Sequence, residues 1–321
     1  MGLFAFLRYA AGLAIVLVLS LGACNDANKS AKPFKVLTTF LPITLFTKAV
    51  AGNCAEVQAL IPANSGPHDF QAKPADLNAL RQAKVLVKNG LGMEEFLGKL
   101  IASADNKDLL VIDTSRGITT LDLPAEEGHA EEAHFSHSHS NHSHSSHGEV
   151  NPHIWLDPLR AVRQVENIRD GLVKADPSCA ASYRRNAATY IAKLQTLNAE
   201  ISNQLNPYQG KTFVAFHDFA PYFANRYKLK ADFLVDVPEL NPSPADLMRV
   251  AADVKRSQLK ALLSEPQEGE RSFNALAKDL GVKISVFDPM ETGSVQASQN
   301  PATYFKVMRS NVADLIKAFG G

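Results

Sequence analysis

Histidine is the residue whose distribution most clearly indicates chemistry in this chain. Of its 10 histidines, seven fall within residues 129–147, where Ser, Glu and Gly fill the gaps. These seven are His129, His134, His137, His139, His142, His144 and His147. The surrounding stretch, 126–148, has no apolar periodicity, which predicts a loop. Dense histidine in a polar tract indicates weak, multivalent capture of metal ions, and an inert solvated linker is the alternative.

The other three histidines stand singly, at His68, His153 and His217. Each lies in a predicted loop or ends a predicted strand, where the ligand sites of open α/β sheets gather. Asp288 ends the last predicted strand and has the corresponding place in the second half. A lone histidine is more often a surface or hydrogen-bonded residue than a ligand. Three imidazoles and a carboxylate nevertheless suit the tetrahedral coordination of Zn²⁺, so we expect one shared metal site.

Alternating strands and helices are predicted to position these residues. The first half has apolar runs at 34–39, 56–60, 84–88 and 109–112, and the second has them at 212–216, 231–235, 261–264 and 283–287. The predicted helices between them are 43–51, 74–83, 94–102, 222–227, 244–255, 272–280 and 302–318. Such alternation favours parallel strands with helices on both faces. The predicted fold is therefore α/β, with two lobes that each contain a mostly parallel four-stranded sheet.

A helical connector, 157–206, lies between the two halves. Asp176-Pro177 divides it into two helices, of which the second runs over about 178–205. Apolar residues recur along this helix at helical spacing: Tyr190, Ile191, Leu194, Leu197 and Ile201. A helix of this length reaches roughly 40 Å, enough to join two lobes as a rigid strut. The expected division is an N-terminal lobe over 34–156, including the loop 126–148, then the connector, then a C-terminal lobe over 207–321.

The first 24 residues have the features of an export signal. Arg8 precedes an uncharged apolar run, Tyr9 to Ala23, that is shorter than the ~20 residues needed to cross a bilayer. The ending Leu21-Gly22-Ala23-Cys24 resembles the bacterial lipobox, which implies a signal peptide over 1–23, a lipid on Cys24 and a tether over 24–33. An uncleaved anchor is the alternative. Both place the body of the protein outside the cytoplasm, at a membrane surface.

Composition excludes several classes of protein. Lys+Arg and Asp+Glu are 33 each, so nothing in the net charge favours a nucleic-acid binder. Three cysteines are too few for a disulfide scaffold. Beyond Cys24, the remaining Cys54 and Cys179 could pair in an oxidising compartment or stay as two free thiols, and the sequence leaves both open.

Six motifs occur in an order and spacing that is specific in combination. They are PHDFQAKPADL (67–77), NPHIWLDP (151–158), FHDFAPYFANRY (216–227), VPELNPSPADL (237–247), SEPQ (264–267) and FDP (287–289). From Lys35 to the C-terminus the chain resembles the zinc-binding lipoproteins of bacterial ABC-type metal importers, which are solute-binding proteins of the metal-specific cluster A-I. The resemblance implies two lobes joined by one long rigid helix, with the metal between them and little lobe movement. It also implies capture of Zn(II), delivery to a membrane permease with its ATPase, and a monomer.

The resemblance also assigns the ligands. His68, His153 and His217 look like the nitrogen ligands and Asp288 looks like the carboxylate. Manganese-binding relatives commonly replace the third histidine by a carboxylate, so His217 favours zinc. Glu291 stands where a glycine is common and is close enough to supply a second carboxylate, so Asp288, Glu291 and water all remain candidates for the fourth position.

The chemistry expected of such a site is capture rather than turnover. Neutral imidazoles bind the metal, so affinity is predicted to fall below about pH 6.5. Asn151, Trp155 and Asp157 are near enough in sequence to orient the rings. A zinc hydrolase is a hypothesis of a different class, but the chain has no HExxH, no GxSxG and no evident paired general base. Two further hypotheses are a manganese or iron carrier and an adhesin-type surface lipoprotein.

Overall fold

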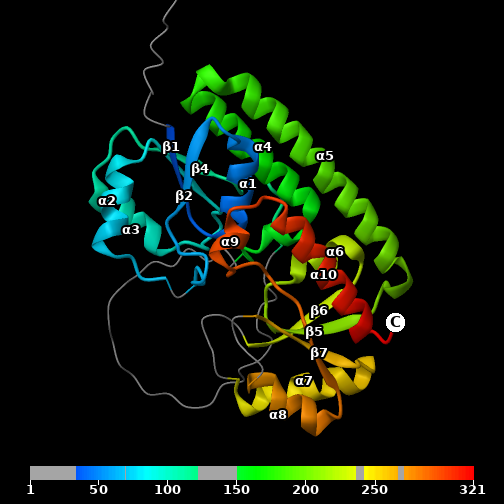
Figure 1. Ribbon diagram of the computed structural model, residues 1–321. Helices are drawn as coiled ribbons and strands as arrows, with labels where there is room; N and C mark the ends of the chain where they lie inside the picture. The colour runs from blue at the N-terminus through cyan, green and yellow to red at the C-terminus, as the bar shows by residue number, and fades with distance from the viewer. Residues whose placement is uncertain (1–33, 69, 122–149, 236–241, 267–270) are drawn as a thin grey trace, which may run out of the picture. The chain divides into compact units, whose positions relative to one another are not determined.

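Two four-stranded parallel sheets form the framework of the chain (Figure 1). The computed structural model describes residues 34–68, 70–121, 150–235, 242–266 and 271–321. The predicted signal peptide, Cys24, the tether and the histidine-rich loop 126–148 with its seven histidines lie outside these residues. The sheet orders are β2-β1-β3-β4 and β6-β5-β7-β8, and every strand pair within them is parallel. The predicted fold class is therefore confirmed.

The first sheet, with helices α1 to α3, forms what we call the N-terminal lobe. Its strands are β1 (Phe34–Thr38), β2 (Ala55–Ala59), β3 (Val85–Lys88) and β4 (Leu110–Asp113), and its helices are α1 (Leu41–Ala51), α2 (Pro74–Gln82) and α3 (Phe96–Ala104). The strands Val36–Leu37 and Val85–Val87 carry fully or almost fully buried apolar side chains. Such continuous apolar runs are expected for parallel strands covered on both faces.

The second sheet, with helices α6 to α10, forms the C-terminal lobe. Its strands are β5 (Thr212–His217), β6 (Lys230–Val235), β7 (Ala261–Ser264) and β8 (Lys283–Val286). Its helices are α6 (Pro221–Tyr227), α7 (Pro244–Ser257), α8 (Arg271–Leu280), α9 (Val295–Ser298) and α10 (Thr303–Ala318). Pro at the first turn of α2, α6 and α7 is favourable because a helix has no partner for that N–H.

Two helices connect the lobes. The short 3₁₀ turn η1 (Ile154–Leu156) leads into α4 (Pro158–Ala175), and the turn η2 (Pro177–Cys179) separates α4 from α5 (Ala180–Leu205). A final turn, η3 (Asn206–Tyr208), leads into β5. The break predicted at Asp176-Pro177 is thus confirmed. Helix α5 has 26 residues, about 39 Å at 1.5 Å each, and it contacts α1 of one lobe and α10 of the other.

A disulfide bond joins Cys54 to Cys179 across 125 positions. It links the turn before β2 to the turn before α5, and so ties the connector to the amino end of the first sheet. The sequence left the pairing open, because nothing along the chain indicates how near two such distant residues lie.

Apolar packing joins the two sheets and the connector in a single hydrophobic cluster. Trp155 is central to it: its side chain is fully buried, and its ring lies 5.0 Å from that of Phe40 in an edge-on contact. The indole N–H donates to the carbonyl of Pro289, and the hydroxyl of Tyr304 donates to the carbonyl of Trp155. Among the described helices, none is long and apolar enough to cross a bilayer.

Candidate metal centre

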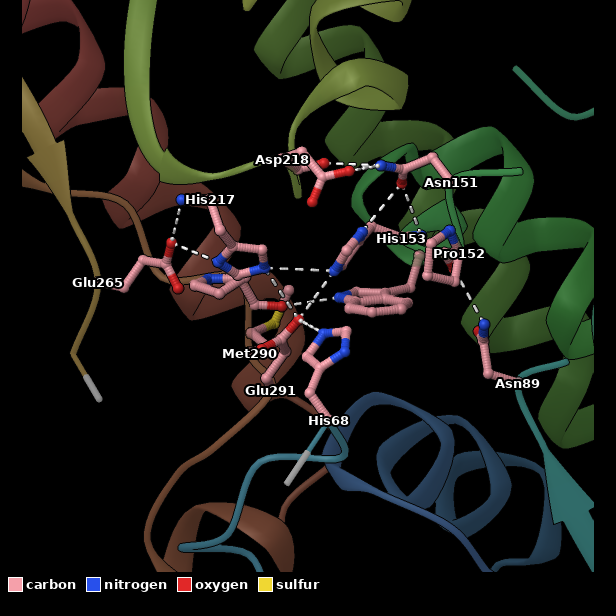
Figure 2. Close-up of polar contacts among 12 residues, drawn as sticks. His68, Asn89, Asn151, Pro152, His153, His217, Asp218, Glu265, Met290 and Glu291 are labelled. Carbon is pink, nitrogen blue, oxygen red and sulfur yellow. Dashed lines mark hydrogen bonds and ion pairs between the residues drawn. The ribbon is translucent and has the colours of Figure 1, made fainter. Parts of the chain in front are cut away.

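Three histidines and one glutamate converge between the two lobes (Figure 2). One potential ligand atom from each of His68, His153, His217 and Glu291 lies within 4.8 Å of all the others. His68 follows β2, His153 precedes η1, His217 is the last residue of β5, and Glu291 follows β8. Three of the four thus come after the carboxyl end of a parallel strand, which is where sites form in open α/β sheets.

The distances within this group match a tetrahedral zinc site. Oε1 of Glu291 lies 2.9 Å from Nε2 of His153, 3.1 Å from Nε2 of His68 and 3.4 Å from Nε2 of His217. The Nε2 atoms of His153 and His217 are 3.4 Å apart. Zn²⁺ binds nitrogen and oxygen at about 2.0–2.1 Å, so the corners of its tetrahedron are about 3.3 Å apart. These four contacts have nearly that separation.

Hydrogen bonds on the outer side of two rings determine which nitrogen faces the centre. Nδ1 of His153 is 2.9 Å from the amide oxygen of Asn151, and Nδ1 of His217 is 2.6 Å from Oε1 of Glu265. Because an amide oxygen and a carboxylate accept hydrogen bonds, each ring carries its proton on Nδ1. Nε2 of each ring then faces the space shared with Glu291, where it can bind a metal once it carries no proton.

Of the three residues predicted as partners of the rings, only Asn151 contacts a site histidine through its side-chain hydrogen bonds. Trp155 bonds to Pro289, and Asp157 caps α4 through Leu159 and pairs with Arg160 and Arg226. Glu265 is a ring partner that the sequence did not predict. It lies in the SEPQ motif directly after β7, the strand beside β5, so its position at the sheet edge was the available signal.

Burial and neighbouring charges shift the pKa values of Glu291 and His217 in opposite directions. Burial by itself raises the pKa of Glu291, but His217, His153 and His68 outweigh it and hold that pKa well below its usual range. Burial likewise lowers the pKa of His217, but the carboxylates of Glu265 and Glu291 raise it well above its usual range. For His153 burial prevails, and its pKa is lowered. The site therefore attracts a positive charge, which is a proton on His217 when no cation is present.

Asp288, the expected carboxylate ligand, is not part of this group. Its Oδ1 accepts the backbone N–H of Met290, while its own N–H and carbonyl bond to the side chain of Asn311. Met290 then adopts a left-handed conformation with φ of 62°. The chain thus turns immediately after the strand, and this turn brings Glu291 rather than Asp288 to the three imidazoles. Burial raises the pKa of Asp288 to about 6.

Access to the group is from the side of His68. Its side chain is 21% exposed, whereas those of His153, His217 and Glu291 are at most 4% exposed. His68 belongs to the segment between β2 and α2, whose described residues form no helix or strand. An ion entering the site therefore meets a loop-borne ligand first and three buried ligands behind it.

Comparison with known proteins places the chain among bacterial metal-uptake components. Residues 36–318 match the family model ZnuA, described as "Zinc-uptake complex component A periplasmic". The zinc-binding lipoprotein AdcA of Streptococcus pneumoniae (strain ATCC BAA-255 / R6) is 32% identical over 304 residues, which are 94% of this chain but 59% of that protein. The chain thus spans less than two thirds of that relative.

Two further similarities cover most of both chains. The high-affinity zinc uptake system protein ZnuA of Bacillus subtilis (strain 168) is 30% identical over 289 residues, which are 90% of this chain and 88% of that protein. The crystal structure of the Zn(II)-bound ZnuA-like domain of Streptococcus pneumoniae AdcA superposes with a TM-score of 0.73 at 29% identity, covering 90% of this chain and all of that one.

Proposed function

Because the chain belongs to the family of periplasmic zinc-uptake components, we propose that it captures Zn(II) outside the cytoplasm and delivers it to the permease of an ABC-type importer. The observation that carries the proposal is the group of His68, His153, His217 and Glu291, whose donor atoms have the spacing of a zinc tetrahedron. These four residues are the proposed ligands, with Zn(II) as cargo.

The donor set favours zinc over harder cations. Three imidazole nitrogens and one carboxylate oxygen suit borderline-soft Zn²⁺, whereas Mn²⁺ prefers oxygen donors and more of them. The ring partners Asn151 and Glu265 hold two of the imidazoles in the binding tautomer. This arrangement supports high affinity, because the rings need no reorientation when the ion arrives.

The proposed role is capture and release, without turnover. Catalytic zinc sites keep a position for water, whereas His68, His153, His217 and Glu291 would together supply four protein ligands.

The proposal also covers the lipid anchor, the histidine-rich segment and the division of the chain into lobes. The lipobox-like ending Leu21–Cys24 supports a lipid anchor on Cys24. The protein is proposed to act as a monomer. The seven histidines of 129–147 support weak auxiliary capture of metal. The chain would be divided into an N-terminal lobe at 34–156, a connector at 157–206 and a C-terminal lobe at 207–321.

The test is zinc binding by the full chain, measured in competition with a chelator of known affinity. One tight site is expected, and it should be lost in His68→Ala, His153→Ala and His217→Ala. Deletion of 126–148 should remove weak binding and leave the tight site. A tight site that survives all three substitutions, or a first zinc that depends on 126–148, would contradict the proposal. Tighter binding of Mn²⁺ than of Zn²⁺ would reassign the cargo.

A further inference from the structure

Asn151 is a fully buried amide that contacts the proposed ligand His153 twice. Its side-chain oxygen accepts the backbone N–H of His153 at 3.0 Å and the ring Nδ1–H at 2.9 Å. These two bonds fix both the position of the His153 backbone and the rotation of its ring. They use the oxygen alone, so the two N–H donors of the amide remain for other partners.

The nitrogen of the same amide bonds to the residue that follows His217. Nδ2 of Asn151 donates to the backbone carbonyl of Asp218 at 2.7 Å and to its Oδ2 at 2.9 Å. Asp218 is itself 7% exposed, so both bonds are shielded from water. Figure 2 shows Asn151 between Asp218 and His153. A single side chain thus links the segment that carries His153 to the end of β5, which carries His217.

The backbone around Asn151 is held from both lobes. Asn89, at the end of β3, donates its amide N–H to the carbonyl of Pro152 at 3.0 Å. From the C-terminal lobe, the hydroxyl of Tyr222 on α6 donates to the carbonyl of Asn151 at 2.8 Å. The same hydroxyl accepts the backbone N–H of Leu121 at 3.1 Å. Asn151 therefore occupies a fixed point between the lobes.

We propose that Asn151 is a positioning residue that holds the histidines of the two lobes in register before the metal arrives. The Nε2 atoms of His153 and His217 lie 3.4 Å apart, and the bonds of Asn151 link the segments that carry these two residues. Glu265 orients His217 from within its own lobe, whereas Asn151 acts between lobes. The proposal rests on the function proposed above. It adds that the four side chains are already assembled in the metal-free protein. Their spacing then suits an ion that forms short bonds, such as Zn²⁺.

N151D removes the donor that reaches Asp218, and it also gives His153 a charged acceptor, so the double variant described below is needed to separate the two effects. The variant keeps an oxygen to accept from His153 but replaces the donating nitrogen with a second oxygen, which faces the carbonyl and carboxylate of Asp218. Zinc dissociation is expected to be about 10- to 100-fold faster, the usual effect of losing a partner outside the ligands. With Co²⁺ in place of Zn²⁺, the intense visible bands of a tetrahedral complex should weaken. The matched control is N167A, because Asn167 on α4 also donates to two backbone carbonyls, those of Thr114 and Arg116, but contacts neither the site histidines nor the C-terminal lobe through these bonds.

The swapped pair N151D/D218N distinguishes bridging from a local effect on His153. It restores a donor opposite an acceptor between positions 151 and 218, so part of the lost affinity and of the cobalt spectrum should return. No recovery in the folded double variant would overturn the bridging role, and so would an N151D protein with wild-type dissociation and spectrum. If the wild-type chain itself binds no zinc tightly, the proposed function fails instead.

A second measurement does not depend on whether N151D folds. Spin labels attached through Ser103→Cys on α3 and Asp279→Cys on α8 report the separation of the lobes, since both positions are exposed. The distance distribution is expected to be the same in metal-free and zinc-loaded protein, and to broaden in metal-free N151A. A distance that shortens when zinc binds to the otherwise wild-type chain would show that the metal, and not Asn151, brings the lobes into register.

Discussion

Oε1 of Glu291 lies 2.9 Å from Nε2 of His153, although 138 positions separate the two residues along the chain. The same oxygen is 3.1 Å from His68 and 3.4 Å from His217, so one carboxylate atom contacts all three imidazoles. A buried carboxylate surrounded by three imidazole nitrogens stabilises any cation that can replace a proton there. This relationship leads to the first two predictions.

Glu291→Gln should weaken zinc binding about 100-fold. Zinc sites with four ligands bind with about 10–16 kcal/mol, so one ligand contributes roughly 3 kcal/mol. Asp288→Asn is the matched control, because an amide oxygen can still accept the N–H of Met290 and keep the turn. Competition with a chelator measures both affinities. If Asp288→Asn caused the larger loss, Asp288 rather than Glu291 would be the fourth ligand.

Zinc binding at neutral pH should release close to one proton. In the metal-free protein the pKa of His217 is raised well above its usual range, so this ring is protonated near pH 7, whereas His153, with a lowered pKa, is neutral. Affinity should therefore rise with pH until the raised pKa of His217 is passed. Calorimetric titrations in buffers with different heats of ionisation count the protons. Binding without proton release at pH 7 would contradict this assignment.

The raised pKa of His217 also predicts how the stability of the metal-free protein depends on pH. A histidine with a raised folded-state pKa stabilises the fold fully below its unfolded pKa of about 6.5, and this contribution is lost as pH rises through the folded value. Zinc-loaded protein should not show this loss, because the metal replaces the proton. Urea unfolding of the two forms between pH 6 and 9 makes the comparison.

Glu265→Gln should lower zinc affinity about 10- to 100-fold, because a neutral amide is a weaker acceptor for Nδ1–H of His217 than a carboxylate. Glu94→Gln is the control, since Glu94 is also buried but accepts from Thr39, Asn89 and Gly90 instead of a site histidine. It should leave zinc affinity unchanged. Equal losses in the two variants would mean that any buried carboxylate near the cleft matters only for folding.

Removing the disulfide with Cys54→Ser and Cys179→Ser should lower the free energy of unfolding by about 3–5 kcal/mol, the range expected for a loop of this length. Zinc affinity should not change, because the bond lies at the amino end of β2, whereas His68, His217 and Glu291 lie at or after the carboxyl ends of strands. Urea unfolding of metal-free protein measures the first effect. A large loss of zinc affinity in the folded variant would show that the connector transmits strain to the site.

The local sequence pattern was sufficient to predict the α/β fold class, the long helix α5 and the break at Asp176-Pro177. These follow from apolar periodicity and from the missing N–H of proline, which act over a few residues. Residue type and predicted position also led to the expectation that the three single histidines converge, and the structure does bring His68, His153 and His217 together.

Tertiary structure alone decided which carboxylate lies among the three imidazoles, which cysteines pair and which side chains bond to the rings. Asp288 and Glu291 are three residues apart, and which of them reaches the imidazoles depends on a turn set by Asn311 and by the left-handed backbone of Met290. Cys54 and Cys179, like Asn151 and Asp218, meet only because packing brings distant segments together. Residue types and short-range spacing carry no information on such distances, which arise from the arrangement of the two sheets around the connector.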